Sequence, residues 1–313
     1  MDYARRIMNN TPIQKLSETK NDNTFYMKRE DLLPFSFGGN KARKAEKFKE
    51  DILNNKATAV ITYGSSESNH CRIISNMCAS LNIKCIIVSP EEKYEKTHNS
   101  ELTKAFGATI IKAPLNQIET TIDAEIERQK NSGENVYFIQ GGGHGNIGTA
   151  AYVDAYGEIK KYEKENKINF DYIFLASGTG TTQAGLICGQ IQHQDFDKKI
   201  IGISIARSKN RGLPIVKQSV SDYLESEENF DKYIVFEDKY TANGYNEANQ
   251  EIKDTIKKIL INDGIALNET YTGKAYNGMI KYIEENNITN KKILFINTGG
   301  LPLFFDKIEE ILK

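Results

Sequence analysis

The segment FSFGGNKARK contains the residue best suited to covalent chemistry, Lys41, which two glycines and an asparagine precede and which Arg43 and Lys44 follow. The neighbouring cations and the positive end of a helix beginning here both disfavour a protonated amine, so they should lower the pKa of Lys41. A lysine that is neutral near pH 7 is a nucleophile able to form a Schiff base. Gly38 and Gly39 would let the backbone approach a flat ring.

A second candidate segment is SGTGTTQAGL, residues 177–186, which follows the apolar run DYIFLA. Gly178 and Gly180 would let the backbone close around an oxyanion, and hydroxyl groups lie at the expected helix start: Thr179, Thr181 and Thr182. The segment matches neither a nucleotide P-loop nor a dinucleotide fingerprint, and a plain strand-to-helix turn is the alternative. A phosphate cradle together with an activated lysine indicates pyridoxal phosphate.

Three more polar or glycine-rich segments follow apolar runs: GSSESNHCR, QGGGHGNIG and TGGLP. Ser68 and Asn69 in the first could begin a helix that holds an anion or a carboxylate, although an ordinary helix cap is the preferred interpretation of this segment taken alone. Four such loops exceed what turn formation needs, so they suggest a lined cleft.

The elements that must position these loops are short β-rich runs alternating with helix-like segments. The runs are residues 58–63, 84–89, 108–113, 135–140, 171–176, 199–205 and 292–297. This alternation predicts an α/β protein with parallel sheets wrapped by helices, in which ligands bind beyond the carboxyl ends of the strands. The charged stretch at residues 155–169 is a candidate lobe boundary, or else a solvated helix face.

The bulk composition favours a small ligand. The chain has 313 residues, enough for two lobes, and its 41 basic side chains nearly cancel its 42 acidic ones, which argues against nucleic acid or a membrane as the main partner. The first residues do not resemble a signal peptide, and we expect a cytoplasmic protein. The four cysteines match no zinc site and are expected to be reduced, so no metal is predicted.

Ordered segments along nearly the whole chain resemble the fold-type II pyridoxal-phosphate enzymes, and within them the D-cysteine desulfhydrase and 1-aminocyclopropane-1-carboxylate deaminase group. The segments are TPIQKL, YMKREDLLPFSFGGNKARK, GSSESNHCR, GGGHGNIGTAAYVDAYGEI, SGTGTTQAGL, ANGYNE, NETYTGKA and ILFINTGGLP. The resemblance implies a tryptophan synthase β-like fold of two open, twisted, mostly parallel sheets with flanking helices. It implies a large cofactor-binding domain (1–46 and 153–313), a small domain (47–152), an active site in the cleft between them and a homodimer.

The resemblance also implies roles for individual residues. Lys41 would bond to the cofactor and act as a base, with Lys44 near the phosphate and Asn69 on the phenolic oxygen. The phosphate would be held by Thr179, Gly180, Thr181 and Thr182. Ser68 would meet the substrate carboxylate or act near the reacting carbon, and His70 would stack beside it unless it is a structural histidine. Tyr245 and Tyr271 match pocket tyrosines of the group, Tyr271 with a catalytic role.

The substrate prediction depends on the partner of the pyridine nitrogen. The deaminase branch carries a glutamate after the tyrosine, whereas this chain has Thr272 there and Thr298 in the TGG loop. A neutral hydroxyl cannot enforce protonation of the nitrogen, which suits β-elimination, so D-cysteine is expected to give pyruvate, hydrogen sulfide and ammonia. Glu67 and His144 depart from the group pattern and leave the exact amino acid open.

Several alternatives share the same residues. Within the fold they are a cyclopropane amino-acid deaminase, a β-replacement enzyme and a racemase. Outside it they are a protein that binds the cofactor or an amino acid without turnover, and a nucleotide-dependent oxidoreductase, for which no acidic residue stands in the right register.

Overall fold

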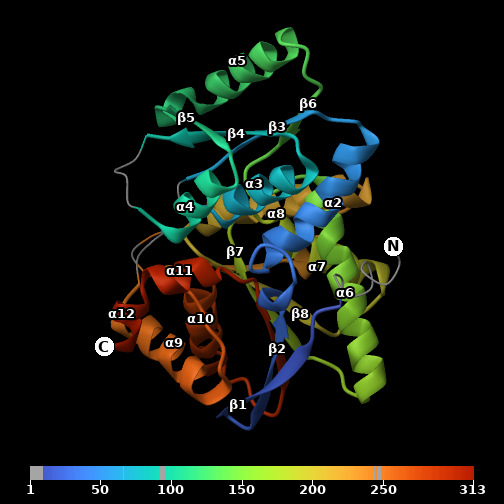
Figure 1. Cartoon of the computed structure of the whole chain (residues 1–313). Helices are drawn as coiled ribbons and strands as arrows, with labels where there is room; N and C mark the ends of the chain where they lie inside the picture. Colours follow the sequence, from blue (N-terminus) through green and yellow to red (C-terminus); the bar gives the residue numbers. More distant parts are fainter. Residues whose placement is uncertain (1–9, 66, 92–95, 243, 245–247) are drawn as a thin grey trace. The chain divides into compact units, whose positions relative to one another are not determined.

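The computed structural model describes residues 10–65, 67–91, 96–242, 244 and 248–313. The chain divides into two compact units, which we call unit 1 (Met1–Arg43 and Thr149–Lys313) and unit 2 (Lys44–Gly148). Both points where the chain passes between the units lie inside helices, α2 (Asn40–Asn54) and α6 (Asn146–Asn166). Each unit is built around its own sheet (Figure 1).

Unit 1 contains a six-stranded sheet in the order β1-β2-β10-β7-β8-β9. All neighbouring pairs are parallel except β1 and β2, which form an antiparallel hairpin. Asn21 and Asp22 connect the hairpin with φ values of 52° and 57°, the left-handed conformation that tight hairpin turns require. The strands are β1 (Ile13–Lys20), β2 (Asn23–Arg29), β7 (Tyr172–Ser177), β8 (Lys199–Ser204), β9 (Val235–Glu237) and β10 (Lys292–Asn297).

Apolar side chains alternate between the two faces of this sheet. Phe174 of β7 and Phe295 of β10 belong to one core cluster, with residues of α9 (Gln250–Asp263) and α10 (Thr272–Glu285). Leu175 and Leu294 belong to the other cluster, with residues of α6, α7 (Thr181–Gln192) and α8 (Lys209–Leu224). Because successive side chains of a strand point to opposite faces, both faces are covered by helices, as parallel sheets require. The remaining helical segments of unit 1 are η1 (Glu30–Leu32), η3 (Asp231–Tyr233), α11 (Leu301–Asp306) and α12 (Ile308–Leu312).

Unit 2 contains a parallel four-stranded sheet in the order β5-β4-β3-β6. Its strands are β3 (Ala59–Tyr63), β4 (Lys84–Pro90), β5 (Thr109–Ala113) and β6 (Val136–Ile139). Ile61, Ile86 and Val88 pack with Ile122 of α5 (Ile118–Asn131) in one core cluster. The other helical segments are α3 (Asn69–Leu81), α4 (His98–Ala105) and η2 (Leu115–Gln117).

The predicted α/β class with two mostly parallel sheets is confirmed, and each of the seven predicted runs contains or overlaps a strand. None of the predicted runs covers β1, β2 or β9. The stretch 155–169, interpreted as a lobe boundary or a solvated face, lies largely within α6 in unit 1, where Tyr156 and Ile159 belong to the core. The four cysteines are buried, and none of them forms a disulfide within the part of the chain that the structure describes.

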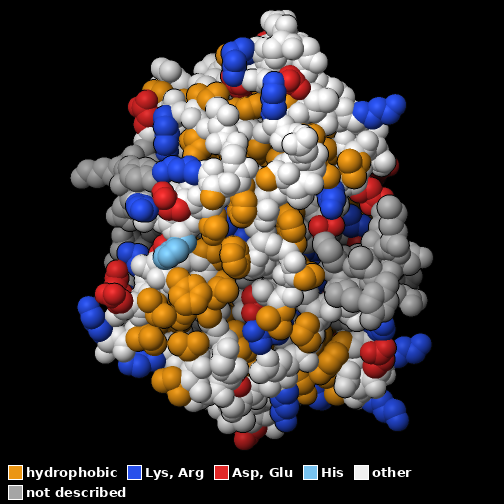
Figure 2. Space-filling view, viewed as in Figure 1, with side chains coloured by type: hydrophobic (Ala, Val, Ile, Leu, Met, Phe, Trp, Pro, Cys, Tyr) orange, Lys and Arg blue, Asp and Glu red, His pale blue; other side chains and the backbone are white. Residues whose placement is uncertain are grey.

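The surface carries charges of both signs. Figure 2 shows Lys, Arg, Asp and Glu dispersed over one face, with apolar side chains gathered in the region of α11. Phe305 of α11 is about half exposed. Among the described helices, none combines the length and apolar character that crossing a bilayer needs.

Candidate active site

The start of α2, which carries Lys41, lies against the loop that follows β10. Gly39 has a φ of 98°, and a Cβ there would lie 2.7 Å from the Thr298 carbonyl oxygen. Only glycine permits both this conformation and this approach of the two backbones. The Asn40 amide nitrogen then donates to the Thr298 carbonyl oxygen at 3.0 Å.

Asn40 also joins α2 to the candidate phosphate loop. Its side-chain Nδ2 donates to Thr182 Oγ1 at 3.1 Å, across 142 residues of sequence. Three segments of unit 1, the starts of α2 and α7 and the loop after β10, are therefore bonded together through the residue that precedes Lys41. Lys41 itself is half-buried at this junction.

Burial lowers the pKa of Lys41 to about 8. A lowered pKa was expected from the sequence. The expected cause was repulsion by neighbouring cations, and for Arg43 this cause is wrong. Two carboxylates surround Arg43: its Nε lies 2.5 Å from Glu30 Oε2 and its Nη1 lies 2.6 Å from Glu158 Oε1. The charge of Arg43 is thereby balanced, so loss of solvent is what favours the neutral amine of Lys41.

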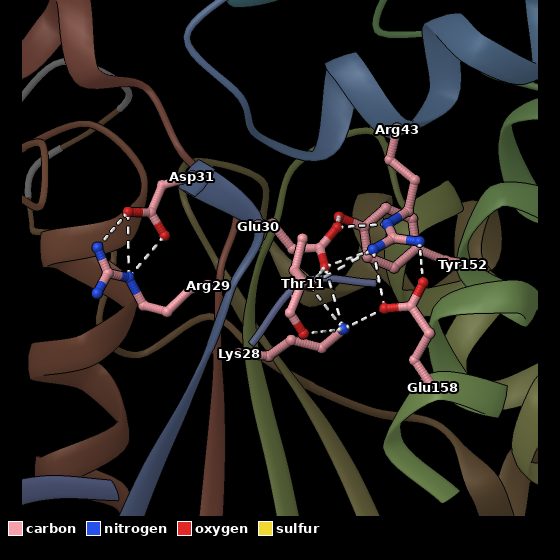
Figure 3. A network of polar contacts seen from close by, with 8 residues as sticks. All are labelled: Thr11, Lys28, Arg29, Glu30, Asp31, Arg43, Tyr152 and Glu158. Atoms are coloured by element: carbon pink, nitrogen blue, oxygen red, sulfur yellow. Dashed lines mark hydrogen bonds and ion pairs between the residues drawn. The ribbon is translucent and has the colours of Figure 1, made fainter. Parts of the chain in front are cut away.

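The ion pairs of Arg43 belong to a buried network that links β2, η1, α2 and α6 (Figure 3). Lys28 donates to Thr11 Oγ1 at 2.7 Å and to Glu158 Oε2 at 2.5 Å. Thr11 Oγ1 in turn donates to Glu30 Oε1 at 2.7 Å. Burial alone would raise the pKa of Glu30, but Arg43 and Lys28 outweigh it and hold that pKa at about 2. The network fixes the first turn of α2, on which Lys41 stands.

The loop between β7 and α7 has the form of an anion cradle. Gly180 caps α7 with a φ of 87°, and a Cβ there would lie 3.2 Å from the Val216 side chain. Thr181 and Thr182 are buried in the first turn of α7, and Thr179 is half-buried. The Arg207 guanidinium donates to the Gly178 carbonyl oxygen at 3.0 Å, which braces the loop. A helix start that presents backbone amide groups and hydroxyls is suited to phosphate.

The start of α10 meets the loop after β10 through Asn268, a buried residue that the sequence analysis did not single out. Asn268 Nδ2 donates to the Gly299 carbonyl oxygen at 2.8 Å and to Thr272 Oγ1 at 3.1 Å. Tyr271, half-buried, donates from its backbone nitrogen to Asn268 Oδ1 at 2.8 Å. Unit 1 therefore brings together eight of the predicted site residues around these loops: Lys41, Thr179, Gly180, Thr181, Thr182, Tyr271, Thr272 and Thr298.

Unit 2 contains the other predicted residues at the start of α3. Ser68 caps α3, and its Oγ accepts from the Cys71 backbone nitrogen at 3.3 Å. Asn69 Oδ1 accepts from Asn99 Nδ2 at 3.0 Å, which turns the Asn69 NH2 group away from Asn99. Asn99 Oδ1 accepts from Arg72 Nε at 2.7 Å, so a buried pair that the sequence analysis missed orients Asn69.

His70 and Lys44 lie inside unit 2. The His70 ring is buried, with Nε2 2.8 Å from Thr62 Oγ1 on β3. Because Thr62 donates its own proton to the Ile139 carbonyl oxygen at 2.7 Å, His70 Nε2 must carry a proton. Lys44 is buried one turn beyond Lys41, and a Cβ at Gly143 would lie 3.3 Å from its Cδ. Tyr245 lies outside the described residues.

Comparisons with known proteins decide the family. The family model described as pyridoxal-phosphate dependent enzyme matches residues 5–299. The chain belongs to the pyridoxal-phosphate-dependent enzyme family.

Solved structures of related folds agree with this assignment. A structure described as an ACC deaminase homologue is 29% identical, with a TM-score of 0.84 over 97% of this chain and 93% of that one. A hydrogen sulfide-producing enzyme from Fusobacterium nucleatum is 18% identical, with a TM-score of 0.67 over 96% of this chain and 98% of that one. An O-acetylserine sulfhydrylase isoform from Entamoeba histolytica is 15% identical, with a TM-score of 0.66 over 96% and 89%. The last two likenesses show the fold alone, which is that of the fold-type II enzymes.

The donor set of unit 1 fits the cofactor of this pyridoxal-phosphate-dependent enzyme. A partly buried amine with a lowered pKa suits its aldehyde, and the glycine and threonine loop at the start of α7 suits its phosphate. The position of Gly180 is one that any Cβ would crowd. Asn40 precedes Lys41 in the sequence, and Asn268 lies in the segment NETYTGKA. Only their contacts in the structure show that Asn40 binds Thr182 and that Asn268 binds Gly299.

Proposed function

We propose that this enzyme removes the α-proton and the β-substituent from a small β-substituted amino acid, with D-cysteine as the leading candidate. D-Cysteine and water would give pyruvate, hydrogen sulfide and ammonia. The observation that carries the proposal is Lys41, an amine whose pKa burial lowers to about 8 and whose helix start is bonded to the cradle of α7 and to the loop after β10.

Several of the predicted residues would hold the cofactor. Lys41 would bond to the aldehyde, and the phosphate would lie on Gly180, Thr181 and Thr182, with Thr179 beside them and Lys44 near them. In unit 1, Thr272 and Thr298 would meet the pyridine nitrogen. In unit 2, Asn69 would donate to the phenolic oxygen, because its carbonyl oxygen already accepts from Asn99.

Bound pyridoxal phosphate supplies an aldehyde for the substrate amine and a conjugated ring that withdraws electrons from the α-carbon. The neutral amine of Lys41 would take the α-proton of the substrate. The C–S bond would then break with its electron pair on sulfur, which leaves as hydrosulfide. Water would hydrolyse the remaining enamine to the 2-oxo acid and ammonia. Ser68 and Tyr271 would bind the substrate carboxylate or act beside the reacting carbon, with Tyr245 in the pocket.

We propose that His70 stabilises the start of α3, which carries Ser68 and Asn69, because its Nε2 is bonded to Thr62. Ser68 uses its Oγ as a helix cap, which leaves its hydroxyl proton able to meet a carboxylate oxygen. These two contacts support different proposed tasks for neighbouring side chains: His70 would orient the start of α3, and Ser68 would present a donor from it.

The residue at position 272 favours elimination over ring opening. Thr272 is fully buried, and its hydroxyl oxygen accepts only neutral N–H groups. A hydroxyl is a neutral partner and leaves the ring a weaker electron sink than a carboxylate would. A weaker sink suffices when the leaving group departs as the proton is lost.

Deamination of 1-aminocyclopropane-1-carboxylate is the second candidate, which the 29% identity to an ACC deaminase homologue favours. Incubating the purified enzyme with D-cysteine, L-cysteine and the cyclopropane acid, while following sulfide and 2-oxo acid, separates the candidates. D-Cysteine should give sulfide and pyruvate in equal amounts, whereas ring opening gives a 2-oxo acid without sulfide. Absence of product from all three substrates would refute the proposed substrate class.

Two variants make this assay specific for the site. Lys41→Ala should abolish product formation and the covalent link to the cofactor, which borohydride reduction and mass spectrometry locate on a peptide. Lys130→Ala, on the exposed face of α5, is the matched control and should change neither. The family resemblance also supports a cytoplasmic homodimer, which light scattering and cell fractionation would test.

A further inference from the structure

Asn268 has a side-chain orientation that its partners fix without ambiguity. Its Oδ1 accepts from the Tyr271 backbone nitrogen at 2.8 Å, and its Nδ2 donates to the Gly299 carbonyl oxygen at 2.8 Å. A backbone N–H can only donate and a carbonyl can only accept, so the amide cannot be flipped. Asn268 is also almost fully buried, which prevents water from replacing these partners.

Asn268 determines what the Thr272 hydroxyl can do. Thr272 Oγ1 accepts from the Asn268 backbone nitrogen at 3.0 Å and from Asn268 Nδ2 at 3.1 Å. These two donors occupy both lone pairs of the hydroxyl oxygen. The hydroxyl proton of Thr272 is therefore available only to a third group, and it must be donated.

The third group is not among the described residues, within which the Thr272 hydroxyl donates no hydrogen bond. Thr272 is fully buried, and a buried donor without an acceptor costs about 1–3 kcal/mol. An acceptor atom of a bound ligand would remove this cost. The same Asn268 amide binds the carbonyl oxygen of Gly299, next to Thr298. The Thr272 hydroxyl therefore lies where the start of α10 meets the loop after β10.

We infer that Asn268 is a positioning residue that makes Thr272 a hydrogen-bond donor and thereby keeps the ring nitrogen of the cofactor unprotonated. The inference rests on the proposed function, in which Thr272 meets that nitrogen. An unprotonated nitrogen accepts the Thr272 proton, whereas a protonated nitrogen would present a third donor to a hydroxyl oxygen whose two lone pairs are already occupied.

Asn268→Asp should reverse the direction of the hydrogen bond between the Thr272 hydroxyl and the ring nitrogen, with almost no change in side-chain shape. One carboxylate oxygen still accepts from Tyr271, while the other replaces the NH2 group, loses the bond to the Gly299 carbonyl oxygen and accepts the Thr272 proton. The Thr272 oxygen then has a lone pair free for the ligand, and the added negative charge lies nearby. Both changes favour a protonated ring nitrogen.

The test is nitrogen NMR of the holoenzyme loaded with cofactor carrying ¹⁵N in the ring, recorded from pH 6 to pH 9. In the wild type the resonance should stay at the position of an unprotonated, hydrogen-bonded nitrogen. Asn268→Asp should move it toward the protonated position and raise the protonation equilibrium about tenfold or more. Thr272→Val, which removes the donor, should move it the opposite way, and Thr272→Ser should leave it unchanged.

The outcomes separate the inference from the proposed function. If Thr272→Val leaves the resonance unchanged, Thr272 does not meet the nitrogen and that part of the proposed site is wrong. If Thr272→Val shifts the resonance but Asn268→Asp does not, the role of Asn268 alone is refuted. A protonated nitrogen in the wild type also overturns the inference. If Asn268→Asp does not bind the cofactor, Asn268→Ala, which removes one of the two donors, should give a smaller shift toward protonation, and no shift would refute the role.

Discussion

Arg43 and Glu30 are joined by two hydrogen bonds in the interior of unit 1, from Nε to Oε2 at 2.5 Å and from Nη2 to Oε1 at 2.9 Å. Both side chains are buried, and Lys28 and Glu158 complete the network (Figure 3). Removing the Glu30 charge would leave two buried cations sharing one carboxylate. Because an uncompensated buried charge is costly, the pair holds α2 in place only while all four charges are present.

Glu30→Gln should therefore lower the free energy of unfolding by about 3–5 kcal/mol, as loss of one partner from a buried ion pair does. Urea denaturation at pH 7 measures this. Glu127→Gln is the matched control, because Glu127 pairs with Lys130 on the exposed surface of α5 and should change stability by less than about 1 kcal/mol. Equal effects of the two variants would contradict the assigned role of the network.

The contribution of Glu30 to stability should depend on pH in a defined window. Its pKa in the folded protein is about 2, below the ordinary value of 4.5 that we expect in the unfolded chain, so the unfolded state binds more protons between these values. The contribution is fully present above pH 4.5 and is lost as the pH falls toward 2. The stability gap between wild type and Glu30→Gln should therefore be constant above pH 5 and narrow below pH 4.5. A gap independent of pH down to 3 would contradict this.

Capture of the cofactor by the apoenzyme should depend on the titration of Lys41. Only the neutral amine attacks an aldehyde, and burial lowers the pKa of Lys41 from 10.5 to about 8. The rate of covalent attachment should rise about tenfold per pH unit below 8 and level off above it. Stopped-flow absorbance from pH 6.5 to pH 9.5 measures the profile. A rate that keeps rising to pH 9.5 would mean that Lys41 keeps an ordinary pKa.

Gly180→Ala should weaken cofactor binding by crowding the cradle of α7. The new Cβ would lie 3.2 Å from Val216 and would adopt a φ of 87°, so the loop must move. Gly133→Ala is a matched control, since Gly133 has a φ of 88° and nothing within 4 Å of a Cβ. Both variants should lose about 1 kcal/mol of stability from backbone strain, but only Gly180→Ala should raise the dissociation constant of the cofactor in equilibrium dialysis.

Asn99→Ala should disturb unit 2 through two buried groups. It removes the acceptor of Arg72 Nε and the donor that holds Asn69 Oδ1. We expect a loss of about 1–3 kcal/mol in unfolding free energy and weaker cofactor binding, because the Asn69 amide loses its shorter bond and keeps the 3.5 Å contact from Arg72 Nη2. Asn55→Ala, which removes an exposed bond to the Asp51 carbonyl oxygen, should change neither property. Intact cofactor affinity in Asn99→Ala would argue against the proposed role of Asn69.

Strand positions were predictable from the sequence where apolar side chains ran continuously. Such runs mark strands buried on both faces, as in β7 and β10, and they identified the parallel parts of both sheets. The hairpin of β1 and β2 carries polar residues between its apolar ones, including Lys28, whose burial depends on Glu158 more than a hundred residues away. No local pattern signals a charge that becomes buried because a distant partner balances it.

Charged residues of the helix α6 are also bound by partners that lie far away in the sequence. Glu158 and Glu163 read as part of a solvated face, yet Glu158 binds Lys28 and Arg43, and Glu163 pairs with the buried Lys198 at 3.0 Å. Helical spacing shows which residues share a face but not what that face meets.

The sequence by itself determined the alternation of strands and helices, the lysine near two glycines and the hydroxyl-rich helix start. These features depend on backbone preferences and side-chain chemistry of residues that are close together in the sequence. The tertiary structure alone decided why Lys41 is a weaker base, which carboxylates neutralise Arg43 and which loop the Asn268 amide binds. Loss of solvent and contacts between distant segments control these properties, and both arise only when the chain has folded.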